Sequence, residues 1–183
     1  MQVIPTEIPD VKVLVPKRFQ DARGFFSETY NKETLRSLGV GVEFVQDNHS
    51  LSVEKGVVRG LHYQLAPMAQ HKLVRVTSGA ILDIALDIRR SSPTFGRHVA
   101  VRISADEWNQ IFVPIGFAHG FVTLEPDTQV IYKVSAPYSP THERGIRWND
   151  AALSIDWGIA EPDAILSERD RKHIQFKEVV DLF

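Results

Sequence analysis

The chain of 183 residues is long enough to form one hydrophobic core and too short for two comfortable domains, so we expect a single domain over 1–183. Its net charge of -2 provides no overall field to attract nucleic acid or an anionic membrane, and the absence of cysteine excludes disulfides, thiolate metal sites and cysteine nucleophiles. No basic and apolar leader opens the chain and no apolar stretch could span a bilayer, so we expect a cytoplasmic protein.

Short β-strands separated by turns account for most of the chain. We expect strands at residues 11–15, 44–48, 72–76, 81–88, 99–103, 110–113, 121–124 and 129–134. Segment 81–88 alternates, with Leu82 and Ile84 on one face and Ile81 and Asp83 on the other. The last two segments look like hairpin partners across the turn at 125–127. Many short strands at regular spacing favour a sandwich or barrel of jelly-roll type.

Helical signals are few. Asn31 can cap a helix over 32–38 that Gly39 ends. The sequence from Ser167 to Asp170 has the form of a capping box that opens a short helix, although such a pattern alone more often marks a plain surface helix start. The fold class that we expect is therefore mainly β, with a few short helices.

Two segments each place one histidine on a short alternating strand beside a glycine turn. They are 59–64, which contains His62, and 114–121, which contains His119. This spacing is similar to that of cupin barrels, which often bind a metal at these two places through a His-x-His pair, a glutamate and a further histidine. Gln64 stands where the second histidine of that pair would be. We therefore expect no bound metal and an imidazole that is free to act as a base.

Each candidate also has an ordinary structural explanation. A single histidine, such as His62 or His119, is more often a hydrogen-bonded structural residue than a base. Lys72 opens a strand and is either a solvated lysine at that strand end or, if it points into a pocket, a stabiliser of a developing enolate oxygen. Tyr132 is either a core tyrosine with its hydroxyl near the rim or a proton donor.

Three arginines, Arg23, Arg59 and Arg169, are expected in turns or at the ends of elements. Surface arginines are usually solvated or weakly paired, but converging guanidinium groups would suit a diphosphate. The chain has no glycine-rich phosphate loop, no dinucleotide fingerprint and no nucleophile elbow. Any phosphate binding would therefore come from side chains.

Ten short motifs, in order along the chain, resemble the dTDP-4-dehydrorhamnose 3,5-epimerase family. The similarity runs from about Ile8 to about Arg171. The motifs are DARGFFSE at 21–28, FVQDNHS at 44–50, VRGLHYQ at 58–64, QHKLVRV at 70–76, SPTFG at 92–96, PIGFAHGF at 114–121, YK at 132–133, YSP at 138–140, WND at 148–150 and LSERD at 166–170. Each is weak alone, whereas the ordered set is highly specific.

The resemblance implies a metal-free, cupin-like jelly roll that needs no cofactor and works as a homodimer in dTDP-L-rhamnose synthesis. The implied substrate is dTDP-4-dehydro-6-deoxy-D-glucose, and the implied product is dTDP-4-dehydro-L-rhamnose. By the same resemblance, His62 is the general base and Asp170 orients it. Lys72 stabilises the C4 enolate, and Tyr132 returns a proton from the opposite face.

The resemblance also implies the remaining site residues. Tyr138 resembles the residue that stacks on thymine. The other substrate contacts are Gln46, Asn48, Arg59, His119, Glu143 and Arg169. A last group, Arg23, Phe26 and Glu28, resembles residues that each subunit lends to its neighbour's site.

Three alternatives remain open on the sequence. A metal-dependent cupin would hold a stoichiometric metal and lose activity with a chelator. A non-catalytic module would bind the nucleotide sugar without exchanging its protons. A related deoxysugar epimerase would invert only C3 or only C5.

Overall fold

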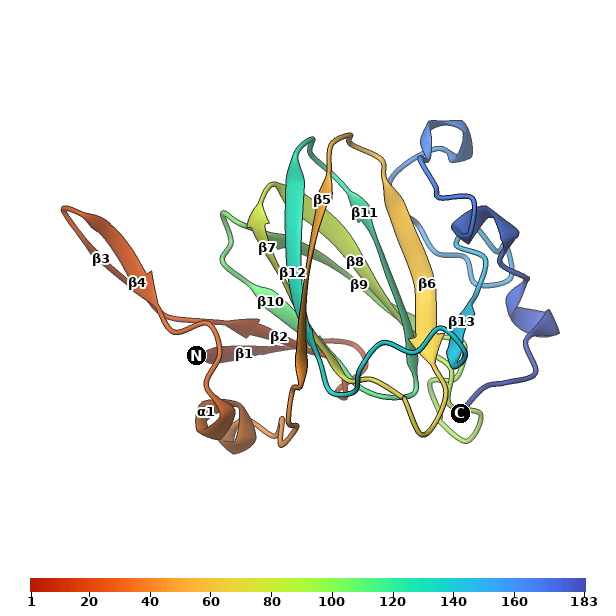
Figure 1. Ribbon diagram of the computed structural model, residues 1–183, viewed down its shortest axis with the longest axis horizontal. Helices are drawn as coiled ribbons and strands as arrows, with labels where there is room; N and C mark the ends of the chain where they lie inside the picture. The colour runs from red at the N-terminus through yellow and green to blue at the C-terminus, as the bar shows by residue number, and fades with distance from the viewer.

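The computed structural model describes residues 1–183, which form two antiparallel β-sheets packed face to face, with a small hairpin projecting from one end (Figure 1). One sheet has six strands in the order β1-β2-β10-β7-β12-β5, and the other has five in the order β13-β6-β11-β8-β9. The strands are β1 (Gln2–Pro5), β2 (Lys12–Val15), β3 (Arg18–Asp21), β4 (Gly24–Ser27), β5 (Gln46–Ser52), β6 (Val58–Gln64), β7 (Lys72–Ser78), β8 (Ala80–Asp87), β9 (His98–Ser104), β10 (Gln110–Val113), β11 (Phe117–Thr123), β12 (Thr128–Val134) and β13 (Glu143–Gly145). The helices are α1 (Lys32–Ser37) and the 3-10 turns η1 (Glu161–Asp163), η2 (Asp170–Lys172) and η3 (Phe176–Glu178).

Two hydrophobic clusters lie on the two faces of the five-stranded sheet. Between the sheets, Ile81 and Ala85 of β8 pack in one buried cluster with Val74 of β7. On the outer face of the five-stranded sheet, Ile84 packs in a second cluster with Trp148 and other residues of the C-terminal segment. Both faces of β8 are therefore buried, because the C-terminal chain covers a face that solvent would otherwise reach.

The expected jelly-roll class is confirmed, and so is the predicted helix. Asn31 caps α1 by accepting the backbone N–H of Thr34 at 3.0 Å, and Gly39 comes after the helix with a φ of 80°. The predicted capping contact at Ser167 is also present, because its Oγ accepts the backbone N–H of Asp170 at 3.1 Å. The element that it opens is only the single 3-10 turn η2.

The predicted hairpin between 121–124 and 129–134 is wrong. Strand β11 pairs with β6 and β8, whereas β12 pairs with β5 and β7 in the other sheet. The turn at Asp127, with a φ of 50°, thus carries the chain from one sheet to the other. Closeness in sequence favoured a hairpin, but both strands have apolar residues to bury, and facing sheets bury them better than an isolated pair.

The hairpin β3–β4 was not predicted from the sequence. It extends away from both sheets (Figure 1) and leaves Phe19, Phe25 and Phe26 exposed. No alternation of apolar and polar residues marks these short strands. None of the chain's helices has the length and apolar character that a membrane crossing requires.

Candidate active site

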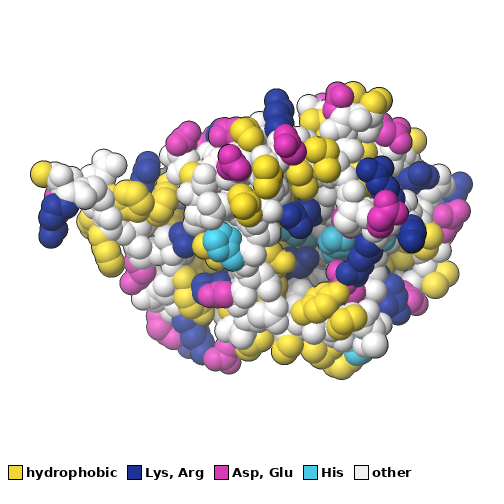
Figure 2. Space-filling view, turned by 45° about the horizontal axis from the view of Figure 1, so that its top comes forward, with side chains coloured by type: hydrophobic (Ala, Val, Ile, Leu, Met, Phe, Trp, Pro, Cys, Tyr) yellow, Lys and Arg dark blue, Asp and Glu magenta, His cyan; other side chains and the backbone are white.

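A pocket opens between the two sheets and has two adjoining lobes of about 330 and 250 Å³. Figure 2 shows this face hollowed, with histidine atoms deep among Lys and Arg side chains. The residues that line both lobes are His62, Lys72, Tyr132, Tyr138 and Glu143. The predicted site residues in a single lobe are Gln46, Asn48, Arg59, His119, Arg169 and Asp170. Eleven of the fourteen predicted residues are therefore brought together.

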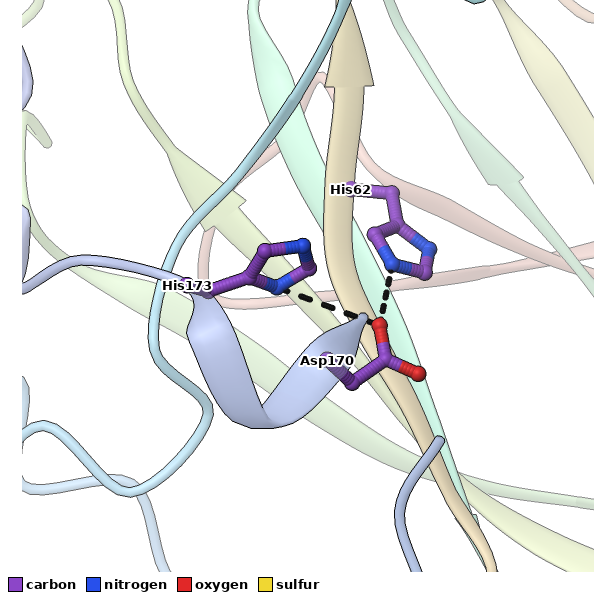
Figure 3. A group of neighbouring side chains, drawn as sticks. All are labelled: His62, Asp170 and His173. Atoms are coloured by element: carbon purple, nitrogen blue, oxygen red, sulfur yellow. Dashed lines mark hydrogen bonds and ion pairs between the residues drawn. The ribbon is translucent and has the colours of Figure 1, made fainter. Parts of the chain in front are cut away.

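His62, on β6, is joined to Asp170, which opens η2 (Figure 3). The Nε2 of His62 lies 2.5 Å from Oδ1 of Asp170, and Ser167 Oγ donates to Oδ2 at 2.8 Å. Burial alone would raise the pKa of Asp170, but these hydrogen bonds and the nearby imidazole hold it below its usual value. A carboxylate only accepts, so the proton lies on Nε2 and the lone pair of neutral His62 lies on Nδ1.

A second pair, His119 and Asp83, lies beside the first. His119 on β11 is opposite His62 on β6 in the strand register, and its Nε2 is 2.8 Å from Oδ2 of Asp83 on β8. Burial lowers the pKa of His119, although the attraction of Asp83 opposes that shift. Asp83 was not predicted as a site residue. Its signal was an acidic side chain on the inward face of an apolar strand, where a charge needs a partner.

Lys72 begins β7 and reaches across the pocket. Its Nζ donates to the backbone oxygen of His62 at 3.4 Å. Burial lowers the pKa of Lys72 to about 8, against the opposing attraction of Asp83. The pocket thus holds a cation whose desolvation makes it unusually ready to interact with a negative oxygen.

Tyr132 lies on β12, in the six-stranded sheet, whereas His62 lies on β6, in the five-stranded sheet. Both line both lobes of the pocket, so they form opposite walls of it. Burial raises the pKa of Tyr132 above its usual value, which keeps the phenol protonated at neutral pH.

Polar side chains are linked to one another at the pocket mouth. The hydroxyl of Tyr138 donates to Glu143 at 2.6 Å, and Arg169 donates to that hydroxyl at 3.1 Å and forms an ion pair with Glu143. Gln46 donates to Asn48 at 2.8 Å and accepts the backbone N–H of Tyr138 at 3.1 Å. These contacts fix the position of the half-exposed ring of Tyr138.

Arg59 is placed deeper, on β6, where its guanidinium donates to Ser52 Oγ at 3.3 Å and to the backbone oxygen of Leu51 at 3.1 Å. It lines the same lobe as Arg169. Two of the three predicted arginines therefore converge.

Three predicted residues lie outside this pocket. Arg23 is at the tip of the projecting hairpin with a side chain that is 90% exposed, and Phe26 in β4 is 70% exposed. Glu28 lines a separate hollow of about 430 Å³. None of them contributes to the site of its own chain.

Gln64 is not available as a pocket ligand. Its buried side chain donates to the backbone oxygens of Met68 and Pro137 and accepts the backbone N–H of Ser139. It therefore fastens two loops together at the end of β6. His62 and His119 are the two histidines at the cupin metal position, and the Nε2 atom of each is hydrogen-bonded to a carboxylate.

A carboxylate-bound histidine and a tyrosine on opposite walls of one pocket, with Lys72 also lining it, suit an enzyme that moves a proton from one face of a carbon atom to the other, as an epimerase does. The family model for dTDP-4-dehydrorhamnose 3,5-epimerase matches residues 5–178. The chain belongs to this family.

Individual relatives are similar to this chain over nearly its whole length. A dTDP-4-dehydrorhamnose 3,5-epimerase from Shigella flexneri is 52% identical over 93% of either chain. The crystal structure of the Bacillus anthracis epimerase, with TDP and PPi bound, has a TM-score of 0.92 at 49% identity and covers 96% of this chain and 99% of its own. The Legionella pneumophila epimerase, in complex with dTDP-4-keto-L-rhamnose, has a TM-score of 0.92 at 41% identity, with coverage of 97% and 94%.

Proposed function

We propose that this chain converts dTDP-4-dehydro-6-deoxy-D-glucose to dTDP-4-dehydro-L-rhamnose by inverting C3 and C5. The observation that carries this proposal is the placement of His62 and Tyr132 on opposite walls of one pocket. Inversion at carbon requires that a proton leave one face of the sugar ring and arrive on the other, so it needs two groups in this arrangement.

The substrate's C4 ketone makes the protons on C3 and C5 acidic, because removal of either one gives an enolate. The Nδ1 of His62 takes the proton. Asp170, on the other nitrogen, holds the tautomer and stabilises the imidazolium that forms. Substrate and product are at the same oxidation level, so the step needs no redox group.

Lys72 and Tyr132 complete the reaction. The ammonium of Lys72 interacts with the C4 oxygen most strongly once that oxygen carries the enolate charge, so it lowers the barrier rather than only binding the substrate. Tyr132 then donates its proton to the opposite face, and its raised pKa keeps it in the acid form until then.

The nucleotide part is proposed to lie at the pocket mouth. Thymine stacks on Tyr138, whose ring is 49% exposed. Arg59 and Arg169 bind the diphosphate, for which bidentate guanidinium groups are well suited. The other proposed substrate contacts are Gln46, Asn48, His119 and Glu143.

We further propose a cytoplasmic homodimer in which Arg23, Phe26 and Glu28 complete the neighbouring subunit's pocket. The exposed aromatic side chains of the projecting hairpin support this, because such apolar surface is usually covered in a working assembly. The whole chain 1–183 would then act as one domain of that dimer.

The decisive experiment is incubation of the protein with dTDP-4-dehydro-6-deoxy-D-glucose in deuterium oxide, followed by NMR. Label at both C3 and C5 with inverted configuration supports the 3,5-epimerase, and label at one carbon alone indicates a 3- or 5-epimerase. Binding without label would indicate a non-catalytic module. Loss of labelling after chelation would indicate a metal-dependent cupin. His62→Ala should slow labelling by at least about 10²-fold, whereas His98→Gln on the distant edge strand β9 should not.

A further inference from the structure

We propose that His62, Asp170 and His173 form a binding site for Zn²⁺, and that zinc bound there inhibits the enzyme. The site contains the predicted base but differs from the cupin metal position, which would join His62 to His119. It goes beyond the proposed function, because the epimerisation as proposed uses no metal.

The three side chains converge on one point (Figure 3). Oδ1 of Asp170 lies 2.5 Å from Nε2 of His62 and 3.8 Å from Nδ1 of His173, and the three donor atoms lie within 4.8 Å of one another. Two imidazoles and one carboxylate form a common zinc donor set, with a fourth position left for water. Tetrahedral zinc with bonds of about 2.0–2.1 Å separates its ligand atoms by about 3.3 Å. Movements of about an ångström would therefore suffice.

His173 supplies the independent evidence for a ligand. Its side chain is only 10% exposed, and its Nδ1 is buried without any hydrogen-bond partner. Buried polar atoms are normally paired, so a buried nitrogen that has no hydrogen-bond partner and lies 3.8 Å from a carboxylate oxygen is suited to bind a ligand. The ring is held in place by the edge of His62, with centroids 5.2 Å apart and planes at 89°, and by the close approach of Gly145.

Zinc at this position would disable the base through the tautomer. In the free protein the proton of neutral His62 lies on Nε2 and the lone pair lies on Nδ1. A zinc ion on Nε2 takes the lone pair of that nitrogen, so the one remaining proton of the neutral ring must lie on Nδ1. Metal-bound His62 then has no lone pair with which to accept a proton from carbon.

The first test is a titration of the full-length, chelator-treated protein with Zn²⁺ alone, in which calorimetry measures the binding. One zinc ion per chain is expected. His173→Phe keeps a flat ring but removes the donor, and His173→Gln keeps polarity. Both should weaken zinc binding at least about tenfold, since even loss of an outer-shell partner costs about 10–100-fold. His98→Gln, which removes another partly buried histidine, should leave the affinity unchanged.

Zinc binding of unchanged strength in both His173 variants, or no stoichiometric binding by the unaltered protein, would overturn the site. If the His173 variants do not fold, His62→Ala removes a second donor and must weaken zinc binding by a similar factor. Because this titration needs no turnover, it succeeds or fails independently of the epimerase proposal.

The second test measures inhibition. Zn²⁺ should suppress deuterium incorporation into the dTDP sugar, and EDTA should restore it. The zinc concentration that gives half-maximal inhibition should match the midpoint of the binding curve. The His173 variants should keep their basal rate and require at least about tenfold more zinc for inhibition. Equal sensitivity of the variants and the unaltered protein would show that zinc inhibits elsewhere.

Discussion

His62 and His119 stand opposite each other in the register of β6 and β11, yet each is hydrogen-bonded to a different carboxylate. Asp170 holds His62, whose side chain is 26% exposed, and Asp83 holds His119, whose side chain is 8% exposed. The two pairs are chemically alike, but only His62 has substantial access to the pocket space. Burial thus distinguishes the proposed base, His62, from His119, which is proposed only to contact the substrate.

Replacing Asp170 should slow the reaction without abolishing it. His62→Ala removes the base and should reduce kcat by about 10²- to 10⁴-fold, which is the usual contribution of general base catalysis. Asp170→Ala leaves the imidazole in place but no longer fixes its tautomer and side-chain conformation, so the loss of kcat should be smaller. Initial rates from NMR measure both variants. A fully active Asp170→Ala enzyme, or near-normal turnover of His62→Ala, would contradict the assignment.

Tyr132→Phe should separate proton exchange from inversion. The variant retains His62 and Lys72, so it should still exchange the C3 and C5 protons for deuterium on the face that His62 serves. Inversion should fall by about 10²-fold or more, because no acid remains on the opposite wall. NMR of the recovered sugar reports both label and configuration. A parallel loss of exchange and inversion would mean that Tyr132 binds the substrate instead.

The charge of Lys72 should set the alkaline limb of the pH profile. Its pKa of about 8 lies below its usual value, so the ammonium is present at neutral pH and is lost as the pH rises through about 8. We expect kcat/KM to fall in that range. Tyr132 does not account for such a limb, because its pKa is raised above the usual 10.

Lys72→Arg provides the check, because a guanidinium stays charged far above pH 10. The alkaline limb should move upward in this variant even if its maximal rate is lower. Lys133→Arg, whose lysine pairs with Asp47 outside the pocket, is the matched control and should keep the original profile. An unmoved limb in Lys72→Arg would show that another group titrates there.

The sequence predicted the strand-rich class and the pocket histidines because both depend on local patterns. Alternation along 81–88 indicated a strand, and the glycine turns located His62 and His119 on strands. The hairpin error at Asp127 arose because pairing in a jelly roll is decided by which sheet buries a strand, and no local pattern encodes that choice.

The sequence analysis missed two site features for a similar reason. Asp83 and His119 are 36 positions apart, and His173 faces Asp170 only because η2 turns both side chains toward β6. Such convergence depends on tertiary packing. The motif resemblance identified Asp170 but gave no role to His173, because sequence spacing alone does not show where a side chain points.

Asp87 should be important for stability rather than catalysis. Burial alone would raise its pKa, but hydrogen bonds from Arg89, Ser92 and Thr94 outweigh burial and hold the pKa below its usual value. Asp87→Ala breaks this buried network and should lower the free energy of unfolding by about 3–5 kcal/mol. Urea denaturation monitored by circular dichroism measures the change.

The pH dependence of that stability is set by the lowered pKa. A carboxylate with a depressed folded pKa stabilises the protein above its unfolded pKa of about 3.9, and this contribution is lost as the pH falls below that value. Asp87→Ala should therefore flatten the acid limb of the stability curve. Glu43→Ala, which breaks the exposed pair with Lys32, should cost less than about 1 kcal/mol. Equal effects of the two variants would argue against the buried network.

A mixing experiment tests whether sites are shared between subunits. Arg23 lies at the tip of the projecting hairpin, far from its own chain's pocket, whereas His62 lies inside it. If Arg23 completes the neighbour's site, Arg23→Ala and His62→Ala should each be impaired alone. Denaturing them together and refolding at equal amounts should restore up to about a quarter of normal activity, because half of the dimers are mixed and each mixed dimer has one intact site. Activity of the mixture equal to the mean of the two separate variants would show that each chain carries a complete site.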